Sequence, residues 1–163
     1  MTAMPDPTVP ARRPALRAIV LGGLLGGTGD FLFAFIFYGF KLRVFQSVAA
    51  GLIGRTAAFA GGMATFLLGV GLHYVIAGIW AALFWLASRR WPRLVRHAVP
   101  SGLAYGLVIF YGMNMVVLPL SALHTSAWPP PFAAWPMAMH MLVVGLPIAL
   151  AGRKYSPAAG AAG

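Results

Sequence analysis

Four long apolar runs, separated by short polar or basic segments, form most of the chain. They extend over residues 18–40, 61–87, 99–120 and 134–151. A helix of about 20 apolar residues, rising about 1.5 Å per residue, covers the roughly 30 Å hydrocarbon core of a bilayer. The pattern therefore predicts an all-α fold, a membrane-spanning four-helix bundle.

A fifth apolar stretch, residues 44–55, is too short to span a membrane. Its larger apolar residues recur at helical spacing: Phe45, Val48, Ala49, Leu52 and Ile53. This spacing favours a short amphipathic helix that lies in the membrane interface after the first span. A re-entrant half-helix is the alternative.

The two ends of the chain differ from its middle. Residues 1–17 are rich in proline and arginine and predict a disordered basic N-terminal tail, while residues 155–163 predict a flexible C-terminal tail. Residues 18–154 then form one four-span transmembrane domain. A basic segment before an apolar run also fits a signal peptide. The first run continues past Asp30 to Phe40, however, so we expect it to be retained as a span.

Composition supports membrane insertion and excludes several other classes. The chain is 60% hydrophobic and 9% charged, and its mean hydropathy is +0.82. Its net charge of +10 does not indicate nucleic-acid binding, because the twelve basic residues lie at the edges of the apolar runs. The lack of cysteine excludes thiol–disulfide exchange, thiolate metal sites and iron–sulfur clusters.

The distribution of Lys and Arg predicts the orientation of the spans. Nine basic residues lie before the first span, between the second and third spans, or after the fourth span, which are all on one side of the membrane. Three lie on the other side. The positive-inside rule then places both termini in the cytoplasm. The three exceptions, Lys41, Arg43 and Arg55, are expected to anchor the interfacial helix by snorkelling.

Each predicted span carries one polar residue that is costly in hydrocarbon. These residues are Asp30, His73, Asn114 and His140. Measured from the span midpoints, all four fall within roughly 5–6 Å along the membrane normal. A carboxylate at such depth costs about 2.5–3.5 kcal/mol on insertion scales, so Asp30 is expected to face a partner inside the bundle.

Small residues precede these polar residues at intervals of four, which places them on the same helix faces. The three stripes are Gly22–Gly26–Asp30–Ala34, Gly61–Thr65–Gly69–His73–Ala77–Ala81 and Gly102–Gly106–Phe110–Asn114. Such stripes allow helix backbones to approach closely. Where they remain exposed, they also offer a surface for a homo-oligomer or for another membrane protein.

The polar layer has several interpretations. It can hold the helices together, since buried polar groups between membrane helices contribute about 0.6–2 kcal/mol each. It can carry protons or a small polar ligand, because histidine titrates near neutral pH. His73 and His140 could also be axial ligands of a haem. The default expectation is that no cofactor is bound.

Metal binding is a further hypothesis. Asp30, His73 and His140 are ligand types that suit zinc or iron. Thioethers suit copper(I), and Met137, Met139 and Met141 flank His140, with Met113 and Met115 on the neighbouring span. Methionine is also a common gap-filler in apolar cores.

No hydrolase or nucleotide-dependent enzyme is expected. The sequence contains no serine–histidine–acid set, no pair of carboxylates and no phosphate-binding loop. Three hypotheses therefore remain: a small integral membrane protein with a functional polar layer, a structural or accessory subunit, and a haem- or metal-binding redox protein. The lipid bilayer is the expected partner in all three.

Several short segments give the chain a family resemblance. They are Ala49–Gly54, Leu72–Tyr74, Gly112–Asn114, Val117–Ser121 and His140–Leu150. Over residues 18–154 the chain resembles a family of small bacterial inner-membrane proteins with four predicted transmembrane helices. The resemblance implies a multi-pass protein of the inner (cytoplasmic) membrane and implies no particular activity.

Overall fold

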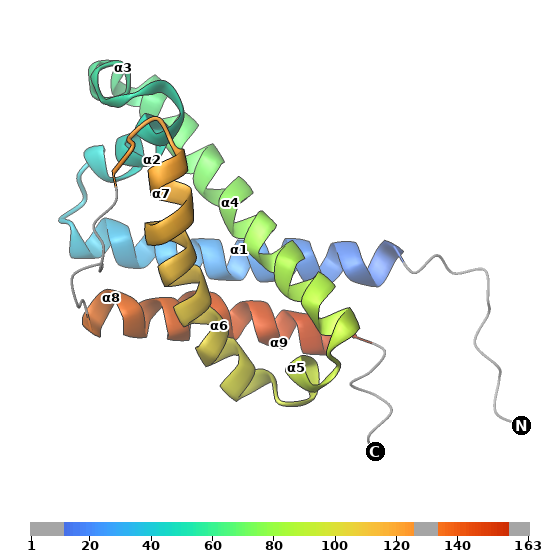
Figure 1. Ribbon diagram of the computed structural model, residues 1–163. Helices are drawn as coiled ribbons and strands as arrows, with labels where there is room; N and C mark the ends of the chain where they lie inside the picture. The colour runs from blue at the N-terminus through green and yellow to red at the C-terminus, as the bar shows by residue number, and fades with distance from the viewer. Residues whose placement is uncertain (1–11, 126–133, 157–163) are drawn as a thin grey trace, which may run out of the picture.

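The computed structural model describes residues 12–125 and 134–156, and within these ranges every regular element is helical (Figure 1). The predicted tails at 1–11 and 157–163, and the Trp128–Pro131 segment of the predicted loop, lie outside the described residues. The elements are α1 (Arg12–Phe37), α2 (Arg43–Ile53), α3 (Arg55–Ala60), α4 (Gly62–Arg90), α5 (Arg93–Arg96), α6 (Ala98–Gly112), η1 (Met113–Val117), α7 (Leu118–Leu120), α8 (Ala134–Met139), η2 (His140–Gly145) and α9 (Leu146–Tyr155).

Four helices are long and apolar enough to cross a membrane, and they coincide with the four apolar runs of the sequence. They are Arg13–Phe37, Gly62–Arg90, Ala98–Leu120 and Ala134–Tyr155. The third long helix consists of α6, η1 and α7, and the fourth consists of α8, η2 and α9. The prediction of an all-α chain with four long apolar helices is thereby confirmed.

Helix α1 differs from its predicted bounds at both ends. It begins at Arg12 rather than at residue 18, because Pro14 lies in the first turn, where its missing N–H removes no helical hydrogen bond. It ends at Phe37 because Gly39 adopts a left-handed conformation with φ of 73°. The Phe40 and Gly39 N–H groups donate to the Phe35 and Ile36 carbonyls, which is the Schellman arrangement of a helix end.

Helix α1 lies between α4 and the fourth long helix, and it uses a different glycine face for each neighbour. A Cβ on Gly26 would lie 3.1 Å from the Val144 carbonyl oxygen in the fourth helix. A Cβ on Gly23 would lie 3.0 Å from the Gly78 Cα in α4. These two contacts bring α1 close to the backbones of both neighbours.

The third and fourth long helices cross at a point where neither has side chains between the backbones. A Cβ on Gly106 would overlap the Met141 Cα and lie 2.5 Å from the His140 carbonyl oxygen. From the other side, a Cβ on Gly145 would collide with the Gly102 carbonyl oxygen. The crossing therefore requires glycine on both helices.

Helix α4 meets the third long helix through Trp80. Its indole ring packs over Gly112, where an added Cβ would lie 2.5 Å from the ring. The indole N–H donates to the Met113 Sδ at 3.4 Å, and the Tyr105 hydroxyl donates to the Trp80 carbonyl at 2.7 Å. These contacts hold Trp80 between the two helices.

Helix α2 confirms that a short apolar helix follows the first long helix. Phe45 and Ala49 are buried, and a Cβ on Gly69 of α4 would collide with the Phe45 carbonyl oxygen. The buried Gln46 side chain donates to the Gly62 carbonyl at 2.9 Å and to the Thr65 hydroxyl at 3.2 Å. Helix α2 is thus held against α4, and its position relative to a membrane stays a prediction.

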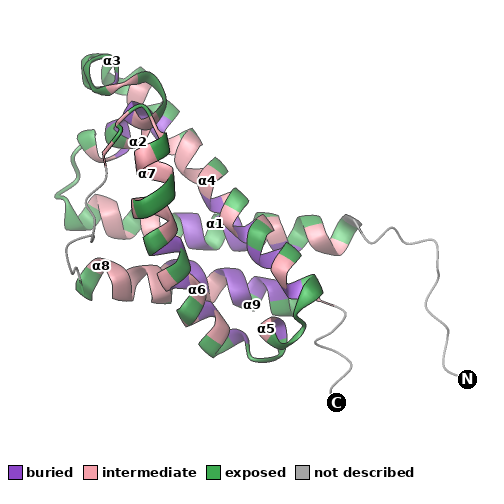
Figure 2. Cartoon of the chain, in the orientation of Figure 1, coloured by how far each residue is buried: buried purple, intermediate pink, exposed green. Residues whose placement is uncertain are grey.

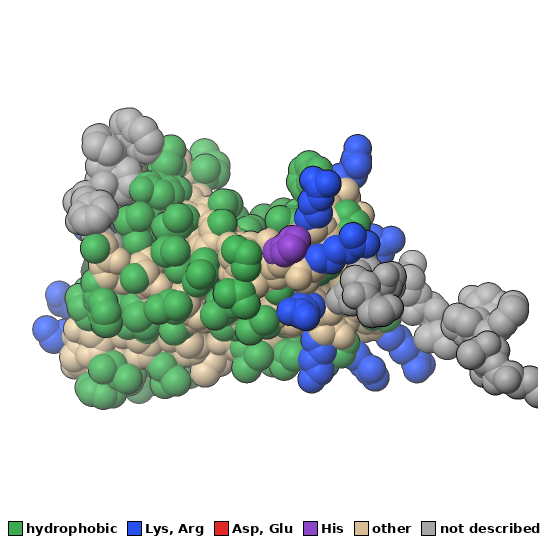
Figure 3. Space-filling view, turned by 90° about the horizontal axis from the view of Figure 1, so that it is seen from below, with side chains coloured by type: hydrophobic (Ala, Val, Ile, Leu, Met, Phe, Trp, Pro, Cys, Tyr) green, Lys and Arg blue, Asp and Glu red, His purple; other side chains and the backbone are tan. Residues whose placement is uncertain are grey.

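The surface of the molecule is mostly apolar along the long helices. Figure 2 shows buried residues where the helices meet and exposed residues on their outer faces. Many of the exposed side chains are large and apolar, including Leu24, Leu67 and Val108. Figure 3 shows hydrophobic side chains over the middle of one face and Lys and Arg side chains at its two ends. A helix exterior of this kind is typical of contact with lipid.

Candidate functional site

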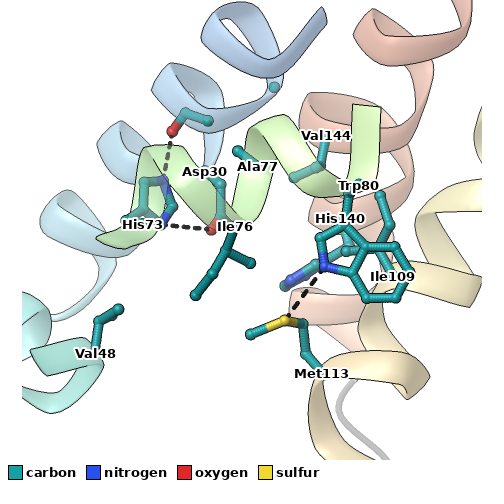
Figure 4. Close-up of a pocket in the computed structure, with 12 residues that line it drawn as sticks. Asp30, Val48, His73, Ile76, Ala77, Trp80, Ile109, Met113, His140 and Val144 are labelled. Atoms are coloured by element: carbon teal, nitrogen blue, oxygen red, sulfur yellow. Dashed lines mark hydrogen bonds and ion pairs between the residues drawn. The ribbon is translucent and has the colours of Figure 1, made fainter. Parts of the chain in front are cut away.

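A cavity of about 170 Å³ lies where α1, α2, α4 and the third and fourth long helices approach one another (Figure 4). Three of the four polar residues singled out in the sequence line it: Asp30 from α1, His73 from α4 and His140 from the fourth helix. The other lining residues are glycine or apolar: Gly26, Gly27, Val48, Ile76, Ala77, Trp80, Ile109, Met113 and Val144. No Lys or Arg is among them.

His73 connects α4 to α1 through both of its ring nitrogens. Its Nε2 lies 2.8 Å from the Gly27 carbonyl oxygen, and its Nδ1 lies 3.9 Å from the Asp30 Oδ2. The side chains of His73 and Asp30 are 13% and 24% exposed, respectively. Asp30 therefore faces an imidazole inside the protein and remains accessible through the cavity.

The hydrogen bond to Gly27 determines which nitrogen of His73 carries a proton. A carbonyl oxygen only accepts hydrogen bonds, so Nε2 must donate. In the neutral ring Nδ1 is then an acceptor, and it points toward a carboxylate that is also an acceptor. The 3.9 Å separation is longer than a hydrogen bond, so the two groups are close without being directly bonded.

His140 lies at the start of the π-helical turn η2 and has one nitrogen in use. Its Nδ1 lies 2.8 Å from the Pro136 carbonyl oxygen, which can only accept, so Nδ1 donates. Its Nε2 has no hydrogen-bond partner among the described residues. The His140 ring packs edge-to-face against Phe110, with 5.5 Å between the ring centroids. It reaches into the cavity near Met113 (Figure 4).

Asn114, the fourth residue of the predicted layer, does not line the cavity. Its amide donates to the Phe110 carbonyl of its own helix at 2.8 Å. It lies in the π-helical turn η1, and such a turn frees a backbone carbonyl that a side chain can satisfy. Of the four polar residues singled out in the sequence, Asn114 thus lies outside the cavity, because a hydrogen bond within its own helix holds its side chain.

The two π-helical turns have similar sequences and the same arrangement. Met113–Leu120 reads MNMVVLPL and Met139–Ile148 reads MHMLVVGLPI, with a proline just after each turn. Proline lacks an N–H and its ring crowds the preceding carbonyls, which favours a widened turn before it. In each case the polar residue after the first methionine bonds to the carbonyl four residues earlier.

A second cavity, of about 280 Å³, adjoins the first. The two share Val48, Ile76 and Met113 in their linings. Apart from Ser47 and Ser121, the second cavity is lined by apolar residues and Gly51. It extends toward α2 and α7, at the end of the molecule away from both termini (Figure 1).

The cavity does not fit a haem. A volume of about 170 Å³ is below the roughly 300–1,000 Å³ of pockets that hold drug-sized ligands, and a haem is larger still. The Nε2 of His73 already donates to Gly27 and its Nδ1 faces Asp30. The geometry therefore leaves His73 only Nδ1 for axial ligation, and the Asp30 carboxylate lies beside that nitrogen.

The described residues also lack a metal-binding cluster of three or more His, Cys, Asp or Glu side chains. Asp30, His73 and His140 share a cavity without forming such a group. Met137, Met139 and Met141 do not line this cavity, and only Met113 of the candidate thioethers does. The positions of these methionine side chains therefore do not support a copper site in the cavity.

Two features of the site were missed in the sequence. Trp80 forms one wall of the cavity, and its position ten residues before Arg90, well inside the second apolar run, was the available signal. Val48 shows that α2 closes the cavity on one side. The spacing of α2 indicated a helix but carried no information about what it covers.

Comparison with protein-family models, with curated proteins and with solved structures finds no match to this chain. Its function must therefore be argued from the side chains around the cavity.

Proposed function

We propose that this chain is a multi-pass protein of the bacterial inner membrane that binds a small polar solute in exchange for a proton. The solute site is the cavity between Asp30, His73 and His140. The four long helices form a transmembrane bundle around it, with both termini in the cytoplasm. Solute would reach the site from the outer side through the second, apolar cavity.

One observation carries this proposal: Asp30 and His73 face each other in a cavity, while the Nε2–H of His73 donates a hydrogen bond to the Gly27 carbonyl. Because Nε2 keeps its proton, the Asp30–His73 pair has a net charge of zero only when it holds one more proton, either on the Nδ1 of His73 or on the Asp30 carboxyl group. Without that proton it carries one negative charge in an apolar surrounding, which is costly. The pair therefore favours binding either a proton or a compensating positive group.

A structural role is the second candidate, and the hydrogen bonds favour it directly. His73 ties α4 to the Gly27 carbonyl of α1, while Asn114 and His140 satisfy carbonyls of their own helices. This role explains the backbone bonds but does not require an acid at position 30. The accessory-subunit hypothesis has less support, because Gly22, Gly26, Gly102 and Gly106 are used in contacts within the chain.

The orientation can be tested because the chain has no cysteine. Tyr38→Cys and Trp91→Cys place single thiols at exposed positions on opposite ends of the molecule. In spheroplasts, we expect a membrane-impermeant maleimide to label Tyr38→Cys and to label Trp91→Cys only after permeabilisation. The reverse pattern would contradict cytoplasmic termini.

The proposed exchange is tested with the purified full chain in lipid vesicles that contain a pH-sensitive dye. The solutes are propylammonium, propionate, propionamide and propanol, which share a size and differ in their polar group. We expect at least one of them to cause a proton movement larger than that in empty vesicles, where neutral propylamine and propionic acid cross the bilayer unaided, and larger than that with Asp30→Asn. If all four give the same trace with and without protein, proton-linked solute binding is wrong.

A further inference from the structure

We infer that the solute is an organic ammonium cation with a short apolar group, and that each bound cation displaces one proton from Asp30 and His73. This inference rests on the proposed function and specifies its ligand. It follows from the hydrogen-bonding capacity of the first cavity, the apolar lining of the second, and the charge balance of the pair.

The donors around the first cavity are already used. The Nε2–H of His73 is bonded to Gly27, the Nδ1–H of His140 to Pro136, and the indole N–H of Trp80 to Met113. What remains free to bind a ligand is the Asp30 carboxylate, the Nδ1 of His73 once the shared proton has left, and the Nε2 of His140 in its neutral form, and all of these are acceptors. A ligand that matches this cavity must therefore donate hydrogen bonds, as an ammonium group does.

Charge and ring chemistry favour the same ligand. Asp30 is the only acidic residue in the described part of the chain, and no Lys or Arg lines the cavity. The indole of Trp80 forms one wall, and a tryptophan face attracts cations. An anion would instead meet the Asp30 carboxylate with no cationic side chain to offset it.

The second cavity indicates the rest of the ligand. It has a volume of about 280 Å³, and an apolar cavity of about 150 Å³ is enough to bind benzene. It lies next to the first cavity, and both are lined by Val48, Ile76 and Met113. A cation with one phenyl-sized group would place its nitrogen near Asp30 and its ring among these apolar residues.

The proton count follows from the charge balance. The resting pair consists of the Asp30 carboxylate, neutral His73 and one proton, with a net charge of zero. When an R–NH₃⁺ cation binds, it supplies the compensating charge, and the proton leaves to solvent while the Nε2–H bond to Gly27 is kept. The net charge is again zero, and no bond other than that to the proton is broken.

The titratable groups near the pair are few. Helix α4 contributes His73 and Tyr74, and the Tyr74 hydroxyl bonds to Thr28 at 3.0 Å rather than lining the cavity. The fourth helix contributes His140. Helix α2 and the third helix contribute only apolar residues to this lining. A proton released on binding is therefore attributable to Asp30 and His73, with His140 as the one group to exclude.

The test is calorimetric binding of benzylammonium to the full chain in detergent, repeated in buffers of different ionisation enthalpy. Benzyl alcohol is the neutral control of the same shape. We expect benzylammonium to bind with release of one proton per cation, and benzyl alcohol to bind at least tenfold more weakly. Asp30→Asn should abolish the proton release and weaken binding at least tenfold.

Three further variants keep the test independent of folding defects. Ile76→Trp fills the junction of the cavities without changing a charge and should abolish benzylammonium binding. Asn114→Ala, at the same predicted depth but outside the cavity, should bind as wild type does. His140→Gln removes one ring nitrogen from the cavity and should weaken binding, but each cation that binds should still release one proton, since that proton belongs to the pair.

The inference is overturned if benzylammonium does not bind at about 10 mM, where a Kd of about 1 mM would give near-saturation, or if it binds without releasing a proton. It is also overturned if Asn114→Ala abolishes binding as Ile76→Trp does. If propionamide or propanol, but not propylammonium, moves protons in the vesicle assay, the ligand class is wrong while proton-linked exchange stands. If no solute moves protons, the proposed function itself is wrong.

Discussion

Gly106→Ala is expected to destabilise the protein by about 1–3 kcal/mol, the usual cost of overpacking, although it adds a single methyl group. The new Cβ would overlap the Met141 Cα and lie 2.5 Å from the His140 carbonyl oxygen. Both are backbone atoms, so the clash cannot be relieved by rotating a side chain. The third and fourth long helices must separate, and His140 must move with its helix. Benzylammonium binding should weaken together with stability.

Gly71→Ala is the matched control for this substitution. Gly71 lies within α4, and a Cβ there would meet nothing within 4 Å. Alanine is favoured over glycine inside a helix by about 1 kcal/mol, so this variant should be as stable as wild type or more so. The measurement is the free energy of unfolding from titration with a denaturing detergent. Equal losses in both variants would contradict the close crossing at Gly106.

Asp30→Asn is expected to abolish proton exchange while leaving the fold intact. Asparagine has nearly the same shape as aspartate, it does not titrate, and it removes a charge that is costly in apolar surroundings. The thermal midpoint should therefore equal or exceed that of wild type, and the proton release on benzylammonium binding should fall from one to zero.

The comparison variant for Asp30→Asn is His73→Leu. It removes the bond to the Gly27 carbonyl and leaves Asp30 without the imidazole. Hydrogen bonds between membrane helices contribute about 0.6–1.7 kcal/mol, so His73→Leu should lose about that much stability. If Asp30→Asn were the more destabilising of the two, a purely structural role for Asp30 would explain the site better than proton exchange.

The helices could be predicted because hydrophobic patterns and glycine stripes report directly on burial and backbone approach. Asp30 was expected to face inward from its cost in hydrocarbon alone, and the structure places it opposite His73. Helix ends were less predictable. Gly39 is a recognisable helix terminator, but a continuous apolar run from residue 18 to Phe40 concealed it.

The direction of a side chain could not be read from its depth. Asn114 and His140 occupy equivalent places in two similar turns, and both bond to a carbonyl four residues earlier. Both side chains keep a further polar atom, the amide oxygen of Asn114 and the second ring nitrogen of His140. Only His140 lines the cavity. The contribution of α2 and Trp80 to the cavity could not be predicted either, because it depends on how helices that are distant in sequence pack together.

Infrared difference spectroscopy of the Asp30–His73 pair is the most direct test of its shared proton. The chain has two acidic side chains, Asp6 and Asp30, so Asp6→Asn leaves a single side-chain carboxylate to observe. On raising the pH, we expect the pair to lose one proton. The difference spectrum should then show the loss of a carboxylic-acid band or of an imidazolium band. That signal should disappear in Asp30→Asn and change in His73→Gln. A carboxylate signal that is identical with histidine or glutamine at position 73 would contradict a proton held jointly by the two residues.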